Sequence, residues 1–185
     1  MESLFRSLGP VIGRPSPAEA LRAGIGALIG LGVTGAFLLS PVVDLTLGLY
    51  LIAPFGATSV LLFAVPNSPL AQPWSAVVGN TLAALVGVVV CSAVADPVLR
   101  IALAVGLTIT VGILCRAIHP PAGAVAMTAA MSPEAVERLG LWFAIAPVAT
   151  GTLALVVCAA IYARLTGRRY PFRQFGEPSR HRTED

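Results

Sequence analysis

An all-α polytopic membrane protein is the fold class that the sequence predicts, on three observations. Charged residues make up only 11% of the chain and hydrophobic residues 56%, a balance that excludes an ordinary soluble domain. The stretch from Leu45 to Ala95 contains no Asp, Glu, Lys, Arg or His and is more than twice as long as the ~20 residues of a transmembrane helix. Further uncharged stretches cover residues 23–43, 101–115 and 139–163.

These stretches divide the chain into three parts. We predict a transmembrane domain at 18–165, a cytoplasmic amino-terminal segment at 1–17 and a basic cytoplasmic tail at 166–185. The net charge of +3 is concentrated toward the ends, which indicates anionic lipid rather than nucleic acid as a partner. The amino terminus has no short apolar core followed by a cleavage site, so no cleaved signal is expected. Three cysteines without paired spacing predict neither a disulfide framework nor a metal site, and no cofactor is expected.

Hydropathy and breaker residues define the elements of the first half. A helix at about 18–40 covers the first apolar stretch. A segment at about 45–65 is apolar too, but Pro54 removes a helical hydrogen bond there and favours a break. The two prolines of Pro66-Asn67-Ser68-Pro69 indicate a turn. A second helix, at about 70–95, follows that turn.

The second half is predicted to follow the same order. A helix at about 98–116 covers the next apolar stretch, and a broken segment at about 119–132 follows it. Within that segment a helix from Pro121 to Met131 would be about 16 Å long at 1.5 Å per residue, too short to cross the membrane unaided. The last helix is expected at about 139–165.

The two halves, 18–95 and 98–165, are similar to each other. A shift of 67 residues places Pro54 on Pro121 and Gly56 on Gly123 without a gap. We interpret this as an internal repeat, in which each copy is a helix, a proline-broken half-helix segment and a helix.

Two topologies follow from the repeat. The chain has either six spans, with the halves inverted, or four spans plus two re-entrant segments, with the halves parallel. Both termini are expected in the cytoplasm in either case, because arginine is enriched in cytoplasmic loops. Only six spans also place Arg116 there, with the balanced Asp96 and Arg100 outside, so six is favoured.

Proline and glycine at the two breaks predict a site for a small anion. Proline suits the first turn of a helix, so Pro54 and Pro121 are expected to start half-helices whose next amides point out unpaired. Gly56 and Gly123 would let a substrate or a helix approach that backbone closely. Helix amino ends carry partial positive charge, and inverted halves would bring two of them together near the midplane. One break alone is typical of a packing kink, whereas paired breaks favour a site.

Polar side chains near the breaks extend this predicted site. The hydroxyls of Thr58 and Ser59 can donate to an anion or to the helix itself. His119 is either a boundary residue at headgroup level or, with an ordinary pKa of about 6.5, a group that binds the anion or relays a proton. Asn80 either joins two helices or lines the path. The predicted substrate-binding set is Pro54, Gly56, Ala57, Thr58, Ser59, Asn80, His119, Pro120, Pro121, Gly123 and Ala124.

Three motifs of this chain point to a known family. They are His119-Pro120-Pro121 followed by Ala122-Gly123-Ala124, then Pro54-Phe55-Gly56-Ala57-Thr58-Ser59, and Gln72-Pro73-Trp74 with Asn80. This combination resembles the HPP family of integral membrane proteins over about residues 18–165. Members similar to this chain occur in bacteria and plant plastids, and the resemblance implies nitrite transport.

The resulting expectation is a transporter or channel for a small monovalent anion, nitrite by the resemblance. We expect it in a bacterial inner membrane as a homo-oligomer, with small-residue contact faces at Gly24, Gly26, Gly30 and Gly32. An enzyme is not expected, because the carboxylates are few and scattered. The alternative is a structural or sensory membrane subunit that acts through a partner.

Overall fold

Helices joined by short turns make up the structure, a computed structural model that describes residues 13, 15–41, 43 and 45–172. The predicted all-α polytopic fold is confirmed. The helices are α2 (Pro17–Leu38), α3 (Leu45–Ala64), α4 (Gly79–Ala93), α5 (Pro97–Leu114), α6 (Pro120–Met131), α7 (Pro133–Leu139) and α8 (Thr150–Leu165). A 3-10 turn, η1 (Pro69–Ala71), and two π-helical segments, η2 (Trp74–Val78) and η3 (Ala144–Ala149), complete the described elements.

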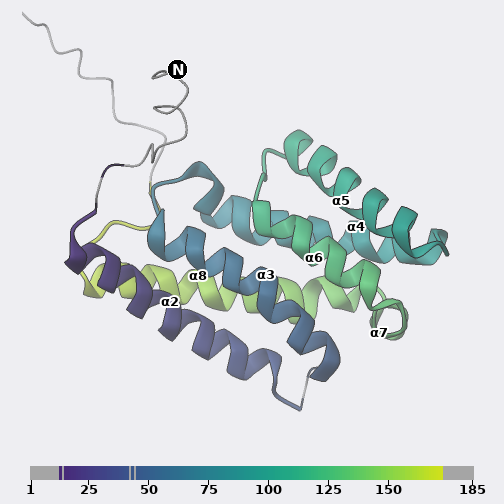
Figure 1. Ribbon diagram of the computed structural model, residues 1–185, viewed down its shortest axis with the longest axis horizontal. Coiled ribbons are helices and arrows are strands. Elements are labelled where there is room, and N and C mark those ends of the chain that lie inside the picture. Colours follow the sequence, from purple (N-terminus) through teal and green to yellow (C-terminus); the bar gives the residue numbers. More distant parts are fainter. Residues whose placement is uncertain (1–12, 14, 42, 44, 173–185) are drawn as a thin grey trace, which may run out of the picture.

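Within the described residues, five helices are long and apolar enough to cross a membrane. These are α2, α3, η2 continued by α4, α5, and η3 continued by α8. The start of α2 and the end of α8 lie at the same end of the molecule, because the Glu19 carboxylate pairs with Arg168 and the Tyr162 hydroxyl donates to the Arg22 carbonyl at 2.8 Å. Along the chain, α2, α3, α4, α5, α6 and α8 alternate in direction (Figure 1). With 12 residues, α6 is shorter than a membrane span, so the choice between the two predicted topologies stays a prediction.

The predicted break at Pro54 is wrong, because α3 continues through it as one helix. Proline has no N–H, so the Tyr50 carbonyl one turn earlier loses its helical donor. The Thr128 hydroxyl of α6 donates to this carbonyl instead, at 3.4 Å. A neighbouring hydroxyl of this kind is what lets proline stay inside a membrane helix.

The last helix also starts later than predicted. Residue 139 ends α7 rather than opening a span, and the backbone turns at Gly140, whose φ of 54° suits glycine. The apolar span begins at Ala144. The sequence-based start was early because the uncharged stretch runs through the turn without interruption.

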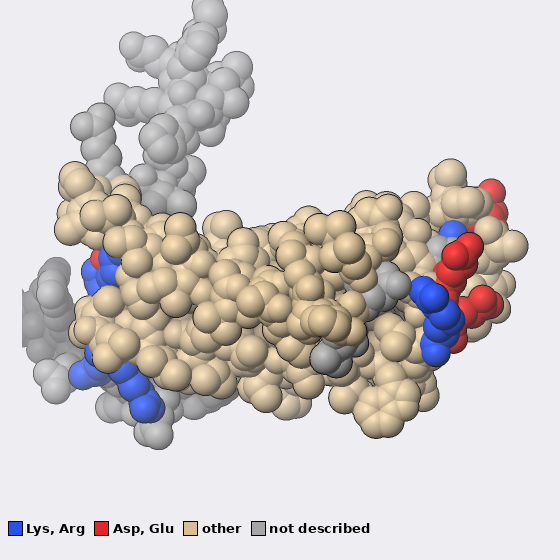
Figure 2. All heavy atoms as spheres, turned by 90° about the horizontal axis from the view of Figure 1, so that it is seen from below, with Lys and Arg blue, Asp and Glu red and all other residues tan. Residues whose placement is uncertain are grey.

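Charged side chains lie at the two ends and leave the middle of the molecule uncharged on the face shown in Figure 2. One end holds Arg22, Arg168 and Arg169 around Glu19. The other end holds Asp96, Arg100, Glu134, Glu137 and Arg138 at the starts of α5 and α7. The remaining arginines of the predicted basic termini, Arg6, Arg14, Arg173, Arg180 and Arg182, lie outside the described residues.

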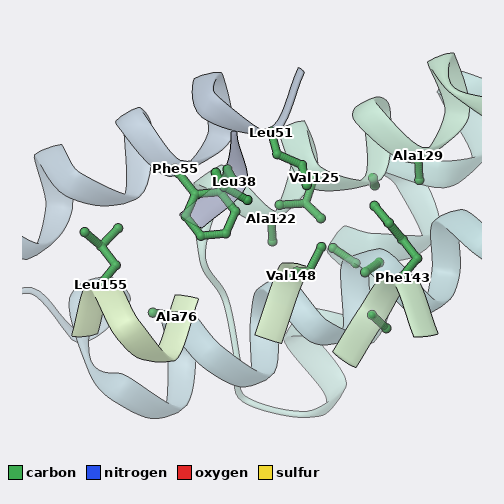
Figure 3. Packing of buried hydrophobic residues seen from close by; sticks show 14 of the residues in the cluster. Leu38, Leu51, Phe55, Ala76, Ala122, Val125, Ala129, Phe143, Val148 and Leu155 are labelled. Atoms are coloured by element: carbon green, nitrogen blue, oxygen red, sulfur yellow. The ribbon is translucent and has the colours of Figure 1, made fainter. Parts of the chain in front are cut away.

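The core is built from small side chains around α6, which packs against α3, α4 and α5. Phe55, Ala122 and Val148 face a common interior (Figure 3).

Two glycines of α2 lie against a neighbouring side chain within the chain. A Cβ at Gly26 would lie 2.5 Å from Cδ1 of Phe63, and one at Gly30 would lie 2.7 Å from Cζ of the same ring. These two glycines therefore pack within the chain, whereas Gly24 and Gly32, the other two of the predicted contact face, have nothing within 4 Å.

Candidate functional site

His119 lies at the meeting point of three segments and is only 4% exposed. It occupies the position before α6, with extended backbone geometry. Its ring joins two other elements, since Nδ1 lies 2.8 Å from the Leu70 carbonyl oxygen and Nε2 lies 3.0 Å from the Thr58 hydroxyl oxygen. The side chain therefore connects η1, α3 and α6 at one point.

The two contacts determine which ring nitrogen must carry a proton. A carbonyl oxygen can only accept a hydrogen bond, so Nδ1 of His119 must carry a proton to bond Leu70. In the neutral ring Nε2 is then the acceptor, and the Thr58 hydroxyl donates to it. Both nitrogens are satisfied in this tautomer, which allows burial of the uncharged ring.

Close contact with α4 positions the histidine segment. A Cβ on Gly79 would lie 2.7 Å from the Ala117 carbonyl oxygen and 2.9 Å from Cβ of His119, so only glycine leaves room there. On the other side, α5 ends in a tight turn in which the Ala117 amide donates to Gly112 at 2.8 Å. Arg116 takes the left-handed position in this turn, with φ 55°. The segment is therefore held between the end of α5 and the start of α4.

The turn that contains Leu70 is stabilised by hydrogen bonds of Gln72 and of residues 170–172. The Gln72 side chain donates to the Pro66 and Ser68 carbonyls at 2.9 Å each and accepts from the Phe172 amide at 2.9 Å. The buried Tyr170 hydroxyl donates to the Ala71 carbonyl at 2.9 Å. Burial raises the pKa of Tyr170, so the hydroxyl stays protonated as a donor. Residues 170–172 thus stabilise the turn at 66–72, and the Leu70 carbonyl of this turn bonds His119.

The amino end of α6 does not present the free amides that we predicted. Pro120 and Pro121 occupy its first two positions and have no N–H, and the Ala122 amide donates to the His119 carbonyl at 2.9 Å. The double proline removes donors that would otherwise be unpaired, so this end can be buried without caps. At Pro54 there is no helix start at all. The backbone cradle predicted from the two prolines is therefore not formed.

The other residues of the predicted set divide by position. Around Pro54, which is buried, Gly56 has nothing within 4 Å, Ala57 is exposed, and the buried Ser59 hydroxyl donates to the Phe55 carbonyl at 3.0 Å. No helix of the described chain therefore approaches Gly56 closely, and approach of a substrate there stays a prediction.

At the second break, Pro120 is exposed and Pro121 is buried. Gly123 and Ala124 are half-buried, and the nearest atom to a Cβ on Gly123 is Cγ1 of Val105 at 3.9 Å. Of the predicted set, His119 and Thr58 are joined by a side-chain hydrogen bond.

Asn80 forms a second buried polar point, toward α8. Its side chain is completely buried, and Nδ2 donates to the Thr152 hydroxyl at 3.1 Å, which in turn donates to the Val148 carbonyl at 2.8 Å. Its side-chain oxygen has no hydrogen-bond partner within the described part of the chain. Asn80 therefore both joins two helices and keeps one polar atom unpaired, at a cost of about 1–3 kcal/mol.

Cavities open at both ends of the helix bundle. A cavity of about 570 Å³ at the basic end is lined by Arg22, Arg168, Arg169 and the turn at 64–68. At the opposite end, cavities of about 440 and 310 Å³ share Arg138 and Ala135 in their walls. The turn that lines the basic cavity continues directly into η1, whose Leu70 bonds His119.

Sequence reasoning missed four residues of this site. Leu70 takes part through its backbone carbonyl, which no residue pattern indicates. Gly79, Thr152 and Tyr170 are recognisable only from their partners, which lie 38 to 99 residues away along the chain. For Gly79 one signal was available, since it directly precedes Asn80 in an apolar stretch.

Comparisons with known proteins agree on a membrane family. A model of the HPP transmembrane region matches residues 12–171 of the chain. Two transmembrane proteins of Dictyostelium discoideum are similar: one is 38% identical over 128 residues (66% of this chain and 41% of that protein), the other 36% over 126 residues (65% and 44%). The chain therefore spans less than half the length of these relatives. No solved structure matches.

Proposed function

This chain belongs to the HPP transmembrane family, and from that membership we propose that it is a transporter or channel for a small monovalent anion. Nitrite is the proposed substrate, on the resemblance of its motifs to nitrite-transporting members. The multi-span fold is of a kind that transport requires.

One observation carries this proposal: His119 is buried in a bundle whose neighbouring elements are uncharged. An ionisable group at such a position is costly, and membrane proteins keep one mainly on a substrate path. The ring is also held in a defined tautomer by Leu70 and Thr58 rather than reaching toward the surface. A histidine that served only as an anchor at headgroup level would be exposed.

A path through the molecule would run between the end cavities past His119. The basic cavity would attract the anion, because among its described lining residues Arg22, Arg168 and Arg169 outweigh the one carboxylate, Glu19. This end is proposed to face the cytoplasm, since cytoplasmic ends are rich in arginine. The turn at 65–72 separates this cavity from His119 and would have to move for passage. A bacterial inner membrane and a homo-oligomer remain parts of the proposal.

Reconstitution of the purified protein tests the proposal. Proteoliposomes should take up nitrite faster than protein-free liposomes, and His119→Ala should remove most of this difference. Thr110→Ala is the matched control, because this exposed hydroxyl of α5 bonds the Gly106 carbonyl of its own helix and no other group among the described residues. Uptake equal to that of protein-free liposomes would contradict transport and favour a structural or sensory subunit. Equal uptake by wild type and His119→Ala would contradict the site.

A further inference from the structure

We infer that the proton is a co-substrate of this site, so that His119 takes up one proton with each anion and the two cross together. The inference rests on the proposed function and adds a coupling partner to it. It starts from the hydrogen-bond geometry of Thr58 and from the lack of acidic residues in the described elements around the ring.

The Thr58 hydroxyl has two acceptors at equal distance. Its oxygen lies 3.0 Å from Nε2 of His119 and 3.0 Å from the Pro54 carbonyl oxygen. With a neutral ring, the hydroxyl donates to Nε2. When Nε2 gains a proton, the new N–H donates to the hydroxyl oxygen, and the hydroxyl hydrogen rotates to the Pro54 carbonyl. One proton is added to Nε2 and no bond between heavy atoms changes.

The second bond of the ring supports the same change. Nδ1 already donates to the Leu70 carbonyl in the neutral state, and the same bond serves the imidazolium. Both N–H groups of the charged ring would thus have an acceptor. Proton uptake at His119 therefore needs only a rotation of one hydroxyl group.

The charge of the imidazolium, by contrast, has no partner in the described elements around it. No Asp, Glu, Lys or Arg occurs in α3, in residues 65–94 or in α6, which hold the residues that contact the ring and its backbone. The neighbouring α5 contains one such residue, Arg100, whose Nε donates to the Ala130 carbonyl at 2.8 Å, at the opposite end of α6 from His119. The nearest ionisable groups along the chain are Cys115 and Arg116, and Tyr170 reaches the neighbouring Ala71 as a neutral donor.

A buried cation without a counter-ion is strongly unfavourable. A monovalent anion beside His119 would supply the missing charge and would itself be stabilised by the imidazolium. Binding of the proton and of the anion must then favour each other equally, because coupling between two ligands is reciprocal. Above the pKa of the unoccupied site, anion affinity should fall by about tenfold for each pH unit. The pair carries no net charge, so transport should be electroneutral.

Nitrite uptake into proteoliposomes under separately controlled gradients tests the coupling. An inward proton gradient should drive uptake, while a membrane potential set with potassium and valinomycin should leave the rate unchanged. Leak of nitrous acid through lipid is measured in protein-free liposomes and subtracted. His119→Gln keeps a polar side chain but cannot take up the proton, so it should lose proton-driven uptake. His181→Gln replaces the other histidine of the chain and should match wild type.

The possible outcomes separate the two proposals. Uptake that an inside-positive potential accelerates in the wild type would overturn proton coupling but leave anion transport in place. Proton-driven uptake in His119→Gln at the wild-type rate would also overturn it. No uptake above the leak under any gradient would overturn the transport function and the coupling together. The wild-type voltage response decides the question even if His119→Gln does not fold.

Discussion

Replacement of Gly79 by alanine should displace His119, and its effect can be worked out from the structure. The added Cβ would lie 2.7 Å from the Ala117 carbonyl oxygen, whereas ordinary contact begins at 3.4 Å. Backbone atoms cannot rotate away as a side chain does, so the 115–119 segment must shift by about 0.7 Å. A shift of that size along the bond would lengthen the distance from Nδ1 to the Leu70 oxygen from 2.8 Å to about 3.5 Å, beyond a normal hydrogen bond.

The expected change in the free energy of unfolding combines two losses and one gain. Overpacking of this kind costs about 1–3 kcal/mol, and loss of the buried Leu70 bond adds about 1–3 kcal/mol. Alanine in a helix recovers only about 1 kcal/mol relative to glycine. We therefore expect Gly79→Ala to lower the free energy of unfolding by about 1–5 kcal/mol and to reduce nitrite uptake.

Thermal melting of the purified variant, followed by uptake measurements in proteoliposomes, tests this expectation. Gly106→Ala is the matched control, because a Cβ there meets nothing within 4 Å and only the helix-propensity gain remains. The control should melt at or above the wild-type temperature. If Gly79→Ala did the same and transported normally, the contact between α4 and the histidine segment would not position His119.

Two further predictions concern the bonds that support the site. Thr128→Val should lower the free energy of unfolding by about 1 kcal/mol in the wild type. In a Pro54→Ala background the loss should be much smaller, because residue 54 regains an N–H for the Tyr50 carbonyl. A double-mutant cycle measures this coupling, and equal losses in the two backgrounds would contradict it. Tyr170→Phe should lower stability by about 1–2 kcal/mol through loss of the buried bond to Ala71 and should reduce uptake, with the half-exposed Tyr50→Phe as a control for melting.

Helix positions could be predicted where local sequence determines them. The starts of α2 and α5 follow from capping residues next to proline: the Ser16 hydroxyl accepts from the Glu19 amide at 3.2 Å, and the Asp96 carboxylate from the Leu99 amide at 2.8 Å. The length of the apolar stretch then predicts where each of these helices ends. Both signals are contained within a few neighbouring residues.

Distant partners explain what could not be predicted. Pro54 breaks a helix unless another group serves the Tyr50 carbonyl, and the group that does so, Thr128, comes 74 residues later in the sequence than Pro54. His119 was recognisable as an ionisable residue beside a break, but its acceptor Leu70 was not. The matched-pair interpretation of Pro54 and Pro121 failed for the same reason, because equal residues have different neighbours in the two halves. The internal repeat itself stays a prediction.

The double proline at the start of α6 has a consequence for which anions could pass. A transported anion must lose water, and a helix end without free N–H groups returns few hydrogen bonds in exchange. The free energy of dehydration would then decide which anions pass, more than the shape of the anion does. We expect weakly hydrated monovalent ions such as nitrite and nitrate to compete with one another, and fluoride, sulfate and phosphate to be excluded.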